Sequence, residues 1–272
     1  MFSLPFRAVI SDLDGTLLNA NHMIGQFTIE TLEKLAKHNI DIILATGRNY
    51  IDVSSILTKI NTNHAVMITS NGARVHNLQG ERLLANNVPE QIALEIMQLP
   101  FDQENVCFNT YQDDGWFINK DVPQLSKFHQ DSGFQYQVVD FKKHHASGVE
   151  KLFFIGRTPQ DLLAIEHQLE NQFHDQITLT YSLPNCLEIM NKNVSKATAL
   201  LEVLAKRDYG VEQCIAFGDG MNDLEMLSIV KKGCIMHNAD QRLKSHLPQL
   251  EQIGSNQHEA VASYLRAIFA IN

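Results

Sequence analysis

The chain has 272 residues, of which 44% are hydrophobic and 19% are charged, and its formal net charge is -9. This length suits one large domain or two modest ones with buried cores, and the composition is that of a folded globular protein. The negative charge argues against a nucleic-acid binder, because phosphate backbones select for surfaces rich in Lys and Arg.

The longest apolar stretches have only the length of strands, and residues 1–10 lack the basic start and extended apolar run of a secretion signal. We therefore expect a cytoplasmic protein without membrane association, and we expect a monomer. The four cysteines have no C-x-x-C spacing and stand mostly beside apolar neighbours. That pattern is typical of buried thiols.

Strand and helix patterns alternate from the start of the chain. Residues 7–12 are predicted to form a buried strand, followed by a helix at 27–37, a strand at 40–46, a helix at 50–60 and a strand at 65–70. This βαβαβ order predicts a parallel sheet with helices on its faces and right-handed crossovers.

The alternation of parallel strands and helices ends near residue 83. Asp113-Asp114-Gly115 separates two strand patterns, which predicts an antiparallel hairpin and hence a second sheet. Thr158, Pro159 and Asp161 have the pattern of a helix start. The remaining elements of this block are a helix at 123–130, strands at 134–139, 151–155 and 177–181, and a helix at 159–173.

The alternation of strands and helices resumes after Leu187-Glu188-Ile189-Met190. Helices are predicted at 195–207, 222–230 and 259–268, and strands at 214–217 and 233–236. The middle block is therefore read as an insertion. We expect a core domain made of residues 1–84 and 186–272 and an inserted α/β cap domain of residues 85–185, each of ordinary domain size.

Acidic residues follow the first predicted strand, in Asp12-Leu13-Asp14-Gly15-Thr16. Ligands of open α/β sheets bind at the carboxyl ends of the strands, and side chains two residues apart point the same way. Two carboxylates brought together are costly unless a cation lies between them. The pair therefore indicates a divalent metal, most naturally Mg²⁺, which prefers oxygen ligands.

Three further segments carry polar groups at strand ends or helix starts. Thr46 and Gly47, in Ala45-Thr46-Gly47-Arg48, indicate an anion site at a strand-to-helix junction. Lys196 stands in the first turn of a helix, where the helix dipole disfavours a cation. The last segment is Gly218-Asp219-Gly220-Met221-Asn222-Asp223, and Ser70-Asn71-Gly72 is left open between a hairpin turn and a pocket wall.

Together these segments resemble the four motifs of the haloacid dehalogenase superfamily, and the whole chain resembles its Cof-type subclass. The resemblance implies a Rossmann-like parallel-sheet core with an inserted α/β cap. It departs at Ala197, where the subclass usually has Gly, and at His237, in the loop after the strand at 233–236.

The resemblance also implies roles for individual residues. Asp12 is the expected nucleophile, and Asp14 is the expected general acid and base, which requires a partly protonated carboxyl group. The expected metal ligands are Asp12, the backbone carbonyl of Asp14, Asp219 and Asp223. The residues expected to hold the phosphoryl group are Leu13, Thr46, Gly47, Lys196 and Asn222.

We therefore expect a Mg²⁺-dependent phosphatase that hydrolyses small phosphorylated metabolites through an aspartyl-phosphate intermediate. By resemblance, its substrate is pyridoxal phosphate or a sugar phosphate. A sugar phosphomutase on the same core and a non-catalytic binding module of the same fold are the alternatives. Trp116 and Lys151 are candidates for substrate contact. The alternatives are that Trp116 packs between cap and core and that Lys151 is an exposed residue of a strand.

Overall fold

A computed structural model describes residues 5–63, 65–113, 115–129 and 132–271. Two β-sheets organise these residues, one for each predicted unit, and short helical turns join several elements. We call the first unit the core and the second the cap.

The core combines strands with helices from both halves of the chain. It contains β1 (Ala8–Ser11), α1 (Gln26–Lys37), β2 (Asp41–Ala45), α2 (Tyr50–Leu57), β3 (Ala65–Thr69), β4 (Arg74–Asn77), β5 (Arg82–Ala85), α5 (Lys196–Leu204), β12 (Cys214–Gly218), α6 (Leu224–Ile229), β13 (Lys232–Met236), α7 (Gln241–His246), β14 (Glu251–Ile253) and α8 (Ala260–Phe269).

The cap and the short turns complete the chain. The cap contains α3 (Glu90–Met97), β6 (Val106–Gln112), β7 (Gly115–Ile118), β8 (Tyr136–Val138), β9 (Val149–Gly156), α4 (Leu163–Phe173), β10 (Ile177–Leu183) and β11 (Cys186–Asn191). The short turns are η1 (Leu13–Leu17), η2 (Ser70–Gly72), η3 (Leu125–His129), η4 (Pro159–Leu162), η5 (Val211–Gln213), η6 (Met221–Asp223) and η7 (Asn256–His258).

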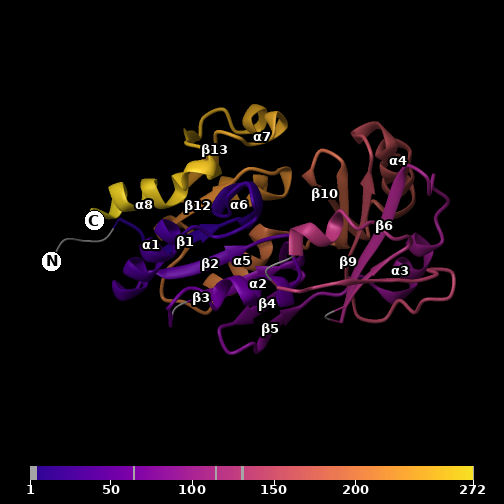
Figure 1. The fold of residues 1–272 in the computed structure, drawn as a ribbon, viewed down its shortest axis with the longest axis horizontal. Helices are drawn as coiled ribbons and strands as arrows, with labels where there is room; N and C mark the ends of the chain where they lie inside the picture. Colours follow the sequence, from indigo (N-terminus) through magenta and orange to yellow (C-terminus); the bar gives the residue numbers. More distant parts are fainter. Residues whose placement is uncertain (1–4, 64, 114, 130–131, 272) are drawn as a thin grey trace.

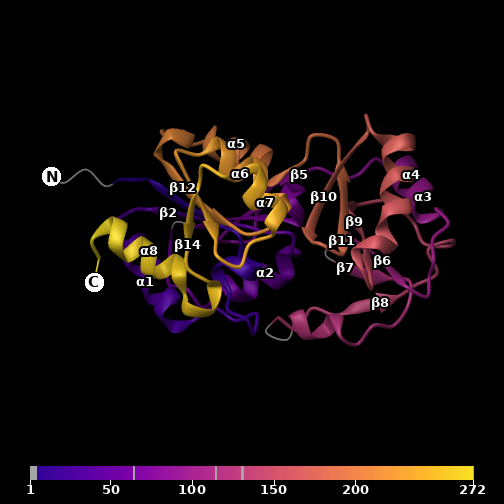
Figure 2. The ribbon, with the colours of Figure 1, turned by 90° about the horizontal axis from the view of Figure 1, so that it is seen from above.

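The core sheet has eight strands in the order β14-β13-β12-β1-β2-β3-β4-β5, and the six strands from β14 to β3 run parallel. Because β1 lies between β2 and β12, the strand order reverses there, and ligands of such sheets bind at that point. Figure 2 shows α5 and α6 on one face of the sheet and α1, α2 and α8 on the other. The prediction of a parallel α/β core is confirmed.

The cap sheet has six strands in the order β10-β11-β9-β6-β7-β8. Helices α3 and α4 cover the face that is turned away from the core, while α8 lies at the opposite end of the molecule (Figure 1). Phe108 and Phe154 pack under these helices, which gives the cap a hydrophobic core of its own. The opposite face of the sheet is turned toward the carboxyl ends of the core strands.

Several local predictions are confirmed. Strands β6 and β7 form the predicted antiparallel hairpin, although Asp114 of its turn lies outside the described residues. Thr158 and Asp161 form a capping box at the predicted helix start, in which the Thr158 N–H donates to the Asp161 carboxylate over 2.6 Å.

The predicted helix at 123–130 is instead the short turn η3, and its last residue, Gln130, lies outside the described residues.

Strand β11 pairs with β9 and β10 of the cap, although the returning core is predicted to begin at residue 186. The run Leu187-Glu188-Ile189-Met190 has the periodicity of a buried strand, but periodicity alone does not say which sheet the strand joins. We therefore propose that the second boundary of the cap follows Asn191 rather than Asn185.

None of the described helices is long and apolar enough to cross a membrane. All four cysteines are buried and unpaired, as the sequence predicts.

Candidate active site

The first acidic turn begins where β1 ends. The Asp12 N–H donates to the Phe217 carbonyl over 3.0 Å, which holds the ends of β1 and β12 side by side. Gly15 has a φ of 76°, a left-handed conformation that glycine adopts without strain. The Thr16 hydroxyl then donates to Asp219 Oδ1 over 2.6 Å. The sharp turn thus brings the first motif against the last one.

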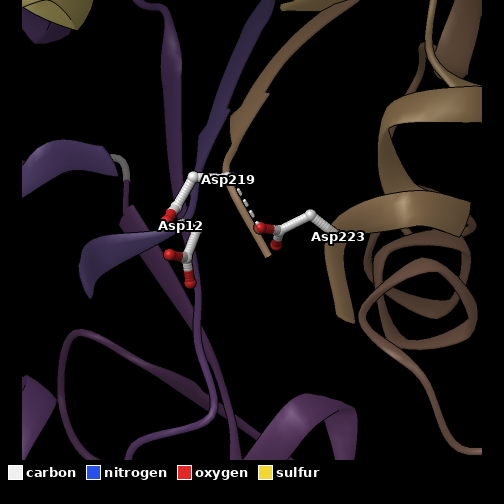
Figure 3. A group of neighbouring side chains, drawn as sticks. All are labelled: Asp12, Asp219 and Asp223. Atoms are coloured by element: carbon white, nitrogen blue, oxygen red, sulfur yellow. Dashed lines mark hydrogen bonds between the residues drawn. The ribbon is translucent and has the colours of Figure 1, made fainter. Parts of the chain in front are cut away.

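Three carboxyl groups from these two strand ends form one cluster. Asp12, Asp219 and Asp223 each offer an oxygen, and these oxygens lie within 4.8 Å of one another. Figure 3 shows the three side chains turned toward one another. Asp223 Oδ2 also accepts the N–H groups of Asp219 and Gly220, over 2.9 and 3.0 Å. Its carboxyl group is therefore fixed by the turn that carries Asp219.

Lys196 is the cation of this cluster. Its ammonium donates to Asp12 Oδ1 over 2.6 Å and to Asp223 Oδ1 over 2.7 Å, and its side chain is fully buried. Ser195 caps α5 through its hydroxyl, so Lys196 occupies the first helical position. Burial lowers the pKa of Lys196, but the charges of Asp12 and Asp223 outweigh burial and raise it above its ordinary value. A charge that is unfavourable for the helix is thus stabilised by tertiary partners.

One ammonium does not balance three carboxylates. Burial raises the pKa of Asp12 well above its ordinary value despite the attraction of Lys196, and Asp223 and Asp219 add to the increase. Burial and the charge of Asp223 raise the pKa of Asp219 to about 7. A cluster of oxygen ligands with uncompensated negative charge fits a hard divalent cation such as Mg²⁺.

The Asp14 side chain turns toward Arg48 rather than into this cluster. Arg48 Nε and Nη2 each donate to one Asp14 oxygen over 2.6 Å, and His22 Nδ1 lies 2.9 Å from Oδ1. Burial raises the pKa of Asp14, but the hydrogen bonds from Arg48 and His22 outweigh it and hold the pKa well below its ordinary value. The expected role as a general acid requires a partly protonated Asp14, whereas this arrangement favours the carboxylate.

The other candidate phosphate-holding groups lie in the turns that follow β1, β2 and β12. The Thr46 hydroxyl accepts the Arg48 N–H over 3.1 Å, which fixes the turn after β2. Asn222 Nδ2 donates to Asn71 Oδ1 over 3.1 Å, so the last motif contacts the turn after β3. Ser70-Asn71-Gly72 is thus the turn between β3 and β4, and Asn71 joins the last motif to Glu188. Leu13 is fully buried in the first turn.

Two charged residues of the cap sheet contact the core at Asn71 and Gly47. Glu188 accepts from Asn71 Nδ2 over 2.5 Å and from Lys151 Nζ over 2.5 Å, and Lys151 also donates to the Gly47 carbonyl over 2.7 Å. Lys151 is 2% exposed, so it is not an exposed strand Lys. Trp116 is also buried, and its indole N–H donates to Asn109. It belongs to the aromatic packing of the cap.

Sequence reasoning assigned no role to several of these residues. Arg48 follows Thr46 and Gly47 in the second motif, but nothing in the sequence shows that it is buried and bound to Asp14. Glu188 stands alone among hydrophobic residues in a predicted buried strand. A single acid in such a position is a sequence signal for a buried, paired carboxylate. Nothing in the local sequence marks His22 as a partner of Asp14.

Gly15→Ala is expected to weaken Mg²⁺ binding by roughly 10–100-fold, because changes to the residues that position a metal ligand typically lower metal affinity by that factor. An added Cβ would lie 2.2 Å from Asp219 Oδ2, and a positive φ strains any other residue by about 1–2 kcal/mol. Calorimetric titration with Mg²⁺ measures the effect. Gly133→Ala is the matched control, since Gly133 has a φ of +67° with nothing within 4 Å of the added Cβ. Equal Mg²⁺ affinity of both variants and the unmodified protein would contradict the expectation.

Comparisons with known proteins identify the family of the chain. The model of the haloacid dehalogenase-like hydrolase family matches residues 9–265. A Haemophilus influenzae protein described as a candidate phosphatase is 58% identical over 270 residues, covering 99% of both chains. The HMP-PP phosphatase of Yersinia pseudotuberculosis is 36% identical over 260 residues, covering 96% of this chain and 94% of its own. A crystal structure from Thermotoga maritima has a TM-score of 0.77 and 28% identity, covering 96% of this chain and 97% of that one.

Proposed function

Because this chain belongs to the haloacid dehalogenase-like hydrolase family, we propose that it is a Mg²⁺-dependent phosphatase of the Cof-type subclass, which acts on small phosphorylated metabolites through an aspartyl-phosphate. The single observation that carries this proposal is the buried Lys196 ammonium between Asp12 and Asp223, with Asp219 completing the acidic cluster. The enzyme class, a phosphoric monoester hydrolase, agrees with the relatives that are named as phosphatases.

Asp12 is the proposed nucleophile. One of its oxygens attacks phosphorus while the bond from phosphorus to the ester oxygen breaks, which gives an aspartyl-phosphate and the alcohol. Lys196 holds Asp12 Oδ1 at 2.6 Å, so the carboxyl group has a fixed orientation before substrate binds. Water then attacks the same phosphorus, and the bond to Asp12 breaks to release phosphate.

The residues proposed to hold the metal are Asp12, Asp219 and Asp223 through their carboxylates and Asp14 through its backbone carbonyl. When bound, Mg²⁺ supplies positive charge that offsets the repulsion between a carboxylate nucleophile and an anionic substrate. The Lys196 ammonium, the Asn222 amide, the Thr46 hydroxyl and the backbone N–H groups of Leu13 and Gly47 are the proposed donors to the phosphoryl oxygens.

Asp14 is the proposed acid and base. As a carboxylate it takes the proton of the attacking water, and the clamp by Arg48 favours that form. In the first half of the reaction it delivers a proton to the leaving alkoxide, so Asp14 has to carry a proton there, and Arg48 sets the position from which it reaches the ester oxygen. The two half-reactions therefore require two protonation states of one side chain, and the contact with Arg48 favours the ionised one.

The substrate is the least constrained part of the proposal. Pyridoxal phosphate and sugar phosphates come from the sequence resemblance, and the HMP-PP phosphatase relative adds a pyrophosphate ester to the panel. A phosphomutase would use the same residues but would return an isomer rather than free phosphate. We expect a cytoplasmic monomer that acts on small molecules.

The test is phosphate release from pyridoxal phosphate, sugar phosphates, a pyrophosphate ester and p-nitrophenyl phosphate. We expect turnover with Mg²⁺, turnover at the level of the blank after EDTA treatment, and recovery when excess Mg²⁺ is restored. Turnover that is unaffected by EDTA would contradict the proposal. Conversion of a sugar phosphate to its isomer without phosphate release would favour the phosphomutase.

A further inference from the structure

Asp52 is a buried carboxylate at the junction of core and cap. It lies in the first turn of α2 and is 1% exposed. Arg48 Nη1, the guanidinium nitrogen that does not bind Asp14, donates to Asp52 Oδ2 over 2.7 Å. The Arg48 side chain is therefore held between two carboxylates, Asp14 on one side and Asp52 on the other.

The other partners of Asp52 come from the cap. His129 Nδ1 lies 2.8 Å from Asp52 Oδ2, and the Ser132 hydroxyl donates to Asp52 Oδ1. His129 is the last residue of η3 and Ser132 precedes β8, so both contacts come from the connection between β7 and β8. Strand β8 is the edge strand of the cap sheet, so this contact ties the far edge of the cap to the core.

The position of His129 is itself fixed by packing. Its ring meets Trp116 with centroids 4.8 Å apart and Phe134 with centroids 5.9 Å apart, both edge to face. Because the ring cannot turn without disturbing these contacts, the direction of its Nδ1–H follows the position of the cap. Burial raises the pKa of Asp52, but the hydrogen bond from His129 and the charge of Arg48 lower it below its ordinary value.

We infer that Asp52, His129 and Ser132 are positioning residues for Asp14, acting through Arg48. The inference rests on the proposed role of Asp14 in proton transfer. Asp52 sets the guanidinium plane of Arg48, and the two cap residues set the Asp52 carboxylate. The seating of the cap and the orientation of Asp14 are thereby coupled through a continuous chain of hydrogen bonds.

The coupling has a consequence for substrates with different leaving groups. An alkyl phosphate expels a basic alkoxide that needs a proton as it departs, whereas p-nitrophenyl phosphate expels a stabilised phenolate that does not. A misplaced Asp14 therefore slows the alkyl ester selectively. The ratio of the two kcat/KM values does not depend on how much of the enzyme is folded, so a purely structural loss leaves this ratio unchanged.

The experiment compares kcat/KM for glycerol 3-phosphate and p-nitrophenyl phosphate with Mg²⁺ present. Asp52→Asn, His129→Leu and Ser132→Ala are expected to lower the ratio of alkyl to nitrophenyl ester by roughly 10-fold, since small misplacements of a catalytic group have effects up to about 100-fold. His129→Asn is expected to restore most of the ratio, because its amide donor takes the place of Nδ1–H. Lys127→Ala, an exposed position on the same turn, is the matched control.

The outcomes separate this inference from the proposed function. An unchanged ratio in Ser132→Ala and His129→Leu would overturn the coupling while the phosphatase assignment stands. Equal losses in His129→Asn and His129→Leu would also overturn it, because the donor would then be irrelevant. An unmodified enzyme that releases phosphate from none of the esters named here or under the proposed function, with Mg²⁺ present, would overturn the proposed function, and the coupling with it. If Asp52→Asn does not fold, the smaller change Ser132→Ala still decides the question.

Discussion

Lys196→Met is expected to lower kcat by at least roughly 10³-fold and to destabilise the fold by about 3–5 kcal/mol. The ammonium is fully buried and donates to Asp12 and Asp223, so methionine leaves two buried carboxylates without their cation. Removing one partner of a buried pair is costly because the remaining charges are desolvated and unpaired. Turnover of p-nitrophenyl phosphate and denaturant unfolding in EDTA measure the two effects.

Lys192→Met is the matched control for this prediction. Lys192 lies on the same connection four residues earlier, its side chain is 51% exposed, and its ammonium is 3.9 Å from Asp175. An exposed pair of this kind contributes about 0–1 kcal/mol. Similar stability of the two lysine variants would mean that the buried ammonium does not hold the acidic cluster together.

Much of this site could be predicted because its groups stand at strand ends. The apolar run before Asp12 and the run before Asp219 each predict a buried parallel strand, and parallel strands deliver their following residues to one edge of the sheet. Lys196 was recognisable because a cation in the first turn of a helix is locally unfavourable. In each case a short-range pattern has a direct spatial consequence.

The network around Asp14 could not be predicted in the same way. Asp52 has the appearance of an ordinary acid in the first turn of a helix, where the helix dipole favours it. Its partner His129 is 77 residues away in the chain, and the contact depends on how cap and core meet. The ionised state of Asp14 follows from Arg48, whose side-chain direction no periodicity encodes.

Asp12→Asn is expected to abolish turnover and yet to stabilise the metal-free protein by about 1 kcal/mol at pH 8, the scale of gain when a functional group under strain is relieved. Burial raises the pKa of Asp12 well above its ordinary value, so the folded protein binds that proton more tightly than the unfolded chain does. The unmodified protein therefore loses stability as the pH rises from the ordinary Asp pKa through the raised one. Asparagine does not ionise, so the advantage of the variant should vanish toward pH 4 and grow with pH.

Asp14→Asn provides the control of opposite sign. Arg48 and His22 hold the pKa of Asp14 below its ordinary value, so its carboxylate stabilises the fold at neutral pH and its loss leaves Arg48 without that partner. We therefore expect the free energy of unfolding in EDTA, measured at several pH values, to be higher for Asp12→Asn than for the unmodified protein and lower for Asp14→Asn. Mg²⁺ should raise the stability of the unmodified protein more than that of Asp12→Asn, because the ligand set of the folded state is then complete. If metal-free Asp12→Asn is the less stable protein at every pH, its bond to Lys196 outweighs the repulsion within the acidic cluster, and the electrostatic case for a cation at this site fails.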